Sequence, residues 1–230
     1  MDLDLLKQLN VEREARRAAI LVTDLEDGSG RLVREGDSVT GDLASAVERG
    51  FRTGKSAAVE SGGRSFFLNV HVPPARLFVI GAVHISQALA PMARIAGFDM
   101  RVIDPRTAFA TEERFANVEL LAEWPDEVLE RQPLDAYTAL AAVTHDPKID
   151  DYPLKAALEA GSFYVGALGS RKTHAKRVER LKEQGVSDEQ IARIASPIGL
   201  DIGAASPQEI AVAILAEIIE ALRKRQVAVN

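Results

Sequence analysis

The chain has 230 residues, 47% of them hydrophobic, and a formal net charge of −6. This composition can fill the cores of one or two domains, while the negative charge argues against general nucleic-acid binding, which depends on Lys and Arg. The absence of cysteine excludes disulfides, thiolate metal sites and persulfides on this chain, and no apolar run is long enough to span a membrane. With an acidic start in place of a leader, we expect a cytoplasmic protein.

The first part of the chain, residues 1–72, predicts a small α+β domain. Its expected helices and strands are, in order, residues 3–17, 19–23, 41–49, 57–59 and 66–70. A glycine-bearing turn follows the first strand at residues 27–30. Val72-Pro73-Pro74 can neither continue a helix nor pair inside a sheet, so we place a domain boundary there, with the second domain at residues 73–230.

Beyond this boundary strands and helices alternate, which predicts an α/β, Rossmann-like fold with a parallel sheet and helices on both faces. The expected strands are residues 77–80, 100–103, 139–144 and 163–166, and the expected helices are residues 84–96, 151–160, 171–184 and 207–225. Gly97 and Gly161 fit the left-handed positions that end helices, and Pro91 predicts a kink. Capping boxes begin at Ser187 and Ser206.

Ligands of such sheets bind beyond the carboxyl ends of the strands, so four loops are candidates. In "LFVIGAVHISQAL", Gly81 supplies a tight turn, but Val83 stands where a second glycine would let backbone approach pyrophosphate. His84 can donate a hydrogen bond to a ligand oxygen. The alternative is that this turn is only a structural strand–helix corner.

In the second loop Asp104 fits a ribose-binding acid, while Arg106 can take a phosphate or pair with Asp104 in an ordinary Asp-Pro turn.

The third loop holds Thr144, His145 and Asp146. A histidine beside carboxylates suits acid–base work or metal binding, although adjacent loop residues point apart and one histidine is a poor metal site. We expect Asp150 or Asp151 to cap the helix that follows.

In the fourth loop Gly166 and Gly169 free the backbone and Ser170 can cap a helix, whose first turn carries Arg171 and Lys172. The N-terminus of a helix is already positive because of the helix dipole. Additional cations there indicate a bound anion such as phosphate. Lys176 and Arg177, further along, are expected on a solvated face.

Two long segments, "GSFYVGALGSRKTHAKRVERL" and "SPIGLDIGAASPQEIAVAILAEI", resemble the Rossmann-like domain of the XdhC/CoxI family, the accessory proteins of xanthine dehydrogenase and related molybdenum hydroxylases. "VIGAVHISQALAPMARIAGFDMRVIDPR" and "THDPKIDDYPLKAAL" are similar to other segments of that family. The resemblance covers roughly residues 74–222. Val83 and the run Thr40-Gly41-Asp42-Leu43, where relatives carry a glycine-rich run ending in Cys-Leu, depart from its pattern.

The resemblance implies a maturation chaperone rather than a catalyst. Such a protein transiently binds the molybdenum cofactor, as molybdopterin or its cytosine dinucleotide, helps a cysteine desulfurase to exchange an oxo for a sulfido ligand, and delivers the cofactor to the apo-hydroxylase. It leaves any catalytic residue unknown and implies no protein-bound metal. The implied ligand-facing residues are Gly81, His84, Asp104, Arg106, Thr144, His145, Asp146, Gly166, Gly169, Ser170, Arg171 and Lys172.

Two other functions remain open. An NAD(P)-dependent oxidoreductase fits the Gly81 loop and Asp104, but Val83 and the lack of a catalytic Tyr-Lys or Cys pair argue against it. An interaction module, including a homodimer, fits the apolar stripe of the last helix, whose members are Ile210, Ile214, Ile218 and Leu222. The same stripe can instead cover one face of the sheet.

Overall fold

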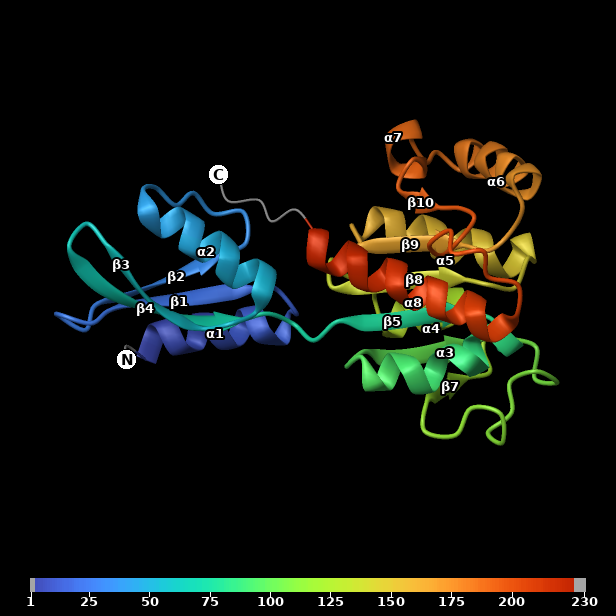
Figure 1. The fold of residues 1–230 in the computed structure, drawn as a ribbon, viewed down its shortest axis with the longest axis horizontal. Helices are drawn as coiled ribbons and strands as arrows, with labels where there is room; N and C mark the ends of the chain where they lie inside the picture. Colours follow the sequence, from blue (N-terminus) through green and yellow to red (C-terminus); the bar gives the residue numbers. More distant parts are fainter. Residues whose placement is uncertain (1–2, 226–230) are drawn as a thin grey trace. The chain divides into compact units, whose positions relative to one another are not determined.

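The computed structural model describes residues 3–225, which divide into two compact units (Figure 1). Of the described residues, 3–73 together with Arg223–Arg225 belong to the first unit, and Pro74–Leu222 form the second. No helix in this described range combines the length and the apolarity needed to cross a membrane.

The first unit is built on an antiparallel sheet of four strands in the order β2-β1-β4-β3. Its elements are α1 (Leu3–Glu14), β1 (Ala19–Asp24), β2 (Gly30–Arg34), α2 (Asp42–Thr53), β3 (Ala57–Ser61) and β4 (Arg64–His71). Ile20 of β1 and Leu68 of β4 are buried, as are Val47 and Phe51 on one side of α2. The sequence did not predict β2, because it buries Val33 alone and so lacks an alternating apolar pattern.

The second unit contains a parallel sheet of six strands in the order β10-β9-β8-β5-β6-β7. Its strands are β5 (Arg76–Ile80), β6 (Asp99–Ile103), β7 (Glu119–Leu121), β8 (Thr138–Ala142), β9 (Tyr164–Ala167) and β10 (Ile194–Ala195). The chain runs outward from β5 to β7 and then returns to β8 on the other side of β5. This doubly wound order confirms the predicted Rossmann-like fold and puts the topological switch point between β5 and β8.

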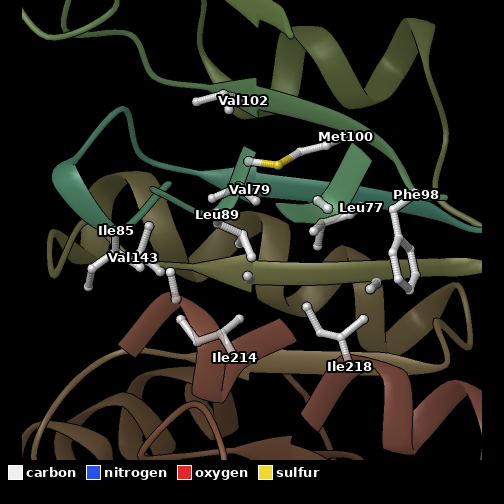
Figure 2. Close-up of a cluster of buried hydrophobic side chains, with 14 of the residues drawn as sticks. Leu77, Val79, Ile85, Leu89, Phe98, Met100, Val102, Val143, Ile214 and Ile218 are labelled. Atoms are coloured by element: carbon white, nitrogen blue, oxygen red, sulfur yellow. The ribbon is translucent and has the colours of Figure 1, made fainter. Parts of the chain in front are cut away.

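The helices of this unit are α3 (His84–Ile95), α4 (Pro125–Arg131), α5 (Pro147–Glu159), α6 (Arg171–Glu183), α7 (Asp188–Ile191) and α8 (Pro207–Lys224). They cover both faces of the sheet, as predicted, because the side chains of β5 alternate between two cores. Leu77 and Val79 join a core with Leu89 of α3 and with α8 (Figure 2). Phe78 and Ile80 join a second core that includes residues of α4, α5, α6 and α7.

The apolar stripe of α8 belongs to the first of these cores. Ile214 and Ile218 are fully buried against the sheet (Figure 2), and Ile210 and Leu222 pack at the edge of the same cluster. Covering the sheet therefore accounts for the stripe without a partner protein.

The capping residue of α5 differs from the prediction. The helix begins at Pro147, four residues before the predicted start, and the carboxylate of Asp146 accepts a hydrogen bond from the Lys148 N–H at 3.0 Å. The expectation that Asp150 or Asp151 caps this helix is therefore wrong, since both are buried inside it. Asp146 can cap because a proline at the first helical position needs no hydrogen-bond acceptor.

Other predicted helix ends are confirmed. Ser187 and Ser206 begin capping boxes, and Gly97 and Gly161 adopt positive φ angles of 84° and 68° after α3 and α5. α3 continues through Pro91. The sequence did not predict the short elements β7, α4 and β10.

Gly166 lies where β9 passes beneath Ile198. A Cβ atom at position 166 would come within 2.7 Å of Ile198 Cγ1 and would collide with the Tyr164 hydroxyl. This hydroxyl donates to Glu217 at 2.5 Å, and the same carboxylate accepts from the Gly199 N–H at 2.8 Å. Packing alone therefore requires glycine here.

We expect Gly166→Ala to lower the free energy of unfolding by about 2 kcal/mol, because the added methyl group overfills a buried site. Urea denaturation followed by circular dichroism measures this change. Unchanged stability combined with weakened ligand binding would instead assign Gly166 to the binding surface.

Candidate anion-binding site

The turn after β5 is held closed by hydrogen bonds within the protein. Gly81 has φ = 121°, and a Cβ there would lie 2.8 Å from Thr144 Cγ2, so only glycine lets this turn pack on the end of β8. The Ala82 N–H donates to Asp104 Oδ2 at 2.8 Å, and the Val83 N–H donates to Ser86 Oγ at 2.9 Å. These backbone donors are the ones that a dinucleotide-binding turn would offer to pyrophosphate.

Asp104, at the end of β6, is fully buried and bound to Arg106. Its Oδ1 accepts from the backbone N–H and the Nε of Arg106, both at 2.9 Å, and its Oδ2 accepts from Nη2 at 2.7 Å. Burial would raise the pKa of Asp104, but the hydrogen bonds from Arg106 and Ala82 outweigh it, and the pKa is lowered. Of the two roles open to Arg106, the structure shows pairing with Asp104.

The third loop folds over a buried carboxyl group. Asp150 accepts hydrogen bonds from Thr144 Oγ1 at 2.7 Å and from the His145 N–H at 3.1 Å. This wrapping puts His145 at φ = 67°, a left-handed conformation that non-glycine residues rarely adopt. Burial raises the pKa of Asp150 to about 6, against the opposing effects of the Thr144 hydrogen bond and the charge of Arg177.

The fourth loop leads into α6, where Ser170 accepts a hydrogen bond from the Thr173 N–H and caps the helix as predicted. Lys176 is exposed, as predicted, but the prediction that Arg177 is solvated is wrong, because only 2% of its surface is accessible. Arg177 lies one turn before Leu181, which anchors α6 in the second core, so its side chain points inward.

The guanidinium of Arg177 is only partly satisfied. Its Nη2 donates to the Leu168 carbonyl at 2.9 Å, but its Nε and Nη1 are buried and have no hydrogen-bond partner among the described residues. Burial lowers the pKa of Arg177, and the charges of Asp150 and Asp151 oppose this effect from a distance.

A cavity of about 320 Å³ lies between the beginning of α5 and the first turns of α6. It is lined by His145, Pro147, Asp150, Asp151, Lys172, Thr173, Lys176, Arg177 and Arg180. Asp151 pairs with Arg180 at 2.5 and 3.0 Å, which neutralises both. Lys172, Lys176 and Arg177 form no ion pair within the described part of the chain, so the cavity is locally positive although the chain as a whole is negative.

The structure distributes the predicted ligand-facing residues over two neighbouring groups. His145 and Lys172 line the cavity, while Thr144, Asp146, Gly169 and Ser170 build the turns behind its walls. Gly81, His84, Asp104 and Arg106 form the second group, at the ends of β5 and β6. The charges of Asp146 and Asp150 contribute to the raised pKa of Arg106, after its hydrogen bond to Asp104, so the groups lie within electrostatic reach of each other.

Two predicted residues lie apart from both groups: Gly166 sits under Ile198, and Arg171 is exposed and does not line the cavity. Thr173, Lys176, Arg177 and Arg180 line the cavity without having been predicted from the sequence. A usable signal was present, because positions 173, 176, 177 and 180 have the spacing of one helical face.

The sequence profile of the XdhC Rossmann domain family matches residues 77–218, which include both groups of residues. The chain belongs to this family. The matched range includes helices α3 to α7 and the loops that surround the cavity.

Three bacterial relatives extend this comparison. The chain is 34% identical over 172 residues to the uncharacterized protein YqeB of Escherichia coli, covering 69% of this chain and 29% of that protein. It is 32% identical over 146 residues to the E. coli molybdenum cofactor insertion chaperone PaoD, covering 64% and 40%. It is 32% identical over 162 residues to a probable xanthine dehydrogenase subunit of Bacillus subtilis, covering 70% and 47%. The chain therefore spans less than half the length of each relative.

A solved structure supports the fold. The crystal structure of a xanthine dehydrogenase from Bacillus halodurans superposes with a TM-score of 0.62 at 24% identity, covering 97% of this chain and 66% of that chain.

The raised pKa of Asp150 makes the stability of this XdhC Rossmann domain depend on pH. Between its usual pKa of 3.8 and its folded value of about 6, the folded protein holds a proton that the unfolded chain has lost. Raising the pH through this window therefore destabilises the fold, by on the order of 3 kcal/mol in total.

We expect Asp150→Asn to remove this contribution. Urea denaturation from about pH 4 to about pH 7 should show wild-type stability falling relative to the variant, with the fall complete above pH 6. Parallel curves for the two proteins would show that Asp150 titrates normally.

Proposed function

We propose that this chain is an accessory protein for a molybdenum hydroxylase such as xanthine dehydrogenase, and that it transiently binds the molybdenum cofactor and assists its sulfuration and insertion. One observation carries the proposal: a chain of the XdhC family places Lys172, Lys176 and Arg177 around a ligand-sized cavity at the carboxyl ends of its strands. The names of PaoD and of the B. subtilis relative, which refer to cofactor insertion and to xanthine dehydrogenase, support the same role.

The residues around the cavity fit the charged end of such a cofactor, a pterin that carries phosphate or a nucleotide. Lys172 and Lys176 supply positive charge, and the first turn of α6 adds the positive end of a helix dipole. His145, on the opposite wall, offers a ring nitrogen to a ligand oxygen. When bound, the cofactor supplies the molybdenum centre on which an oxo ligand is replaced by a sulfido ligand.

The chain has no cysteine at any of its 230 positions, so it cannot carry sulfur as a persulfide. In the proposed role a cysteine desulfurase supplies the sulfur, and this protein holds and orients the cofactor that receives it. The apo-hydroxylase is the second partner.

The structure gives less support to an NAD(P)-dependent oxidoreductase. The strand order suits a dinucleotide, but both oxygens of Asp104 already accept hydrogen bonds from Ala82 and Arg106. A ribose could use this carboxylate only by breaking those bonds.

The proposal is tested by purifying the protein from a molybdenum-replete host and measuring oxidised pterin fluorescence after acid extraction. The wild-type protein should yield pterin. The double variant Lys172→Ala/Lys176→Ala should yield at least about tenfold less pterin, because each lost charge-assisted hydrogen bond is worth about 1.5–3 kcal/mol.

Arg171→Ala is the matched control, since Arg171 is an exposed cation in the same helical turn as Lys172 but does not line the cavity. This variant should retain most of the pterin. A wild-type protein without pterin, or equal losses in the double variant and the control, would contradict the proposal.

A second experiment follows the sulfur. When a desulfurase transfers radioactive sulfur in the presence of this protein, label should reach the cofactor or the partner and none should stay on this polypeptide after denaturation. Label that survives denaturation on this chain would contradict the direct-transfer route.

A further inference from the structure

We infer that the cavity between α5 and α6 is a phosphomonoester site centred on Arg177, so that the chain selects compact ligands with a terminal phosphate over dinucleotides. The inference rests on the proposed function only for the identity of the natural ligand, which would then be the cofactor form without an attached nucleotide. The choice between the two ligand classes follows from four features of the chain itself.

The usual dinucleotide crevice is closed. At the switch point, the Ala82 and Val83 amides donate to Asp104 and Ser86, and Gly81 packs directly on Thr144. A pyrophosphate would have to displace those internal acceptors, and a ribose would have to displace Arg106 from Asp104. Each lost bond leaves a buried polar group unsatisfied.

Among the described residues, no carboxylate pairs with Arg177. Buried charges are normally paired, and buried N–H groups normally donate. Yet the nearby carboxylates are engaged elsewhere: Asp151 with Arg180, and Asp150 with Thr144 and the His145 N–H. An anion in the cavity, whose wall Arg177 helps to form, would supply the missing acceptor after a small movement of its side chain.

The guanidinium is also anchored through one of its nitrogens before any ligand arrives. Its Nη2 is bonded to the Leu168 carbonyl, and Gly169, at φ = 139°, lets the chain turn tightly beside it. A cation fixed in this way loses little conformational freedom on binding, which favours affinity.

The size and charge of the cavity favour a terminal phosphate. About 320 Å³ is near the lower limit for small-molecule sites, of roughly 300–1,000 Å³. A phosphomonoester concentrates about two negative charges on one group at neutral pH. Lys172, Lys176 and Arg177 can neutralise such a group together, whereas a pyrophosphate linkage spreads its charge and carries a nucleoside on each side.

The experiment compares inorganic phosphate, 5′-CMP and NAD as ligands of the full chain by isothermal titration calorimetry. Phosphate and 5′-CMP should bind, and NAD should bind at least about tenfold more weakly than 5′-CMP. NAD binding as tight as that of 5′-CMP, or no binding of phosphate, would overturn the inference.

Arg177→Met tests the central residue. It should weaken phosphate binding about tenfold or more while the melting temperature of the ligand-free protein stays level or rises, because replacing an unpaired buried charge with an apolar group of similar size is seldom costly. Arg177→Lys should recover part of the affinity. Lys182→Ala is the control, since Lys182 lies on the same helix but pairs with Asp188 away from the cavity.

Phosphate binding by Arg177→Met equal to that of the wild-type protein would overturn the inference, as would a melting temperature that falls while phosphate binding is kept. The two proposals fail separately. A protein that binds phosphate but purifies without pterin contradicts the cofactor role alone, and one that carries pterin but binds NAD as well as 5′-CMP contradicts the phosphomonoester site alone.

Discussion

The buried carboxylate of Asp104 fixes the ligand-binding edge of the parallel sheet. Its two oxygens join the end of β6 to the turn after β5 through the Ala82 N–H, and they hold Arg106 in the same cluster. A buried carboxylate is tolerated only when hydrogen bonds and a cation compensate its desolvation, so these bonds depend on one another. With this cluster intact, the first strand–helix turn has no free carboxylate for a ribose, and its Ala82 amide is unavailable to pyrophosphate.

The site where an anion can bind is therefore displaced along the sheet, to the loops after β8 and β9. There three cations form no ion pair with any described residue: Lys172 and Lys176 at the surface, and Arg177 inside. A protein that only needed stability would gain from pairing Arg177 or replacing it, because an unsatisfied buried guanidinium is unfavourable. The retained charge is consistent with a ligand that reaches the protein from outside and leaves again, as transient cofactor binding requires.

The sequence predicted the architecture well where apolar patterns are long, and less well where single hydrogen bonds decide. β5 and α8 were located because their apolar runs or stripes are continuous, whereas β7 and β10, with three and two residues, are too short to carry a pattern. The cap of α5 was misplaced because three aspartates compete in residues 146–151, and only the backbone geometry selects Asp146. Arg177 was assigned to solvent because the local charge density resembles a solvated face, whereas the packing of Leu181 in the second core turns it inward.

The most direct measurement is the position of a bound oxyanion in a crystal of this protein. Tungstate resembles phosphate in shape and charge, and its anomalous scattering locates it without bias from the surrounding residues. The account predicts the strongest anomalous peak in the cavity between α5 and α6, within hydrogen-bond distance of Arg177 and Lys172. A peak at the beginning of α3, beside Val83 and His84, with none in the cavity, would show that the turn after β5 is the anion site and would contradict the account.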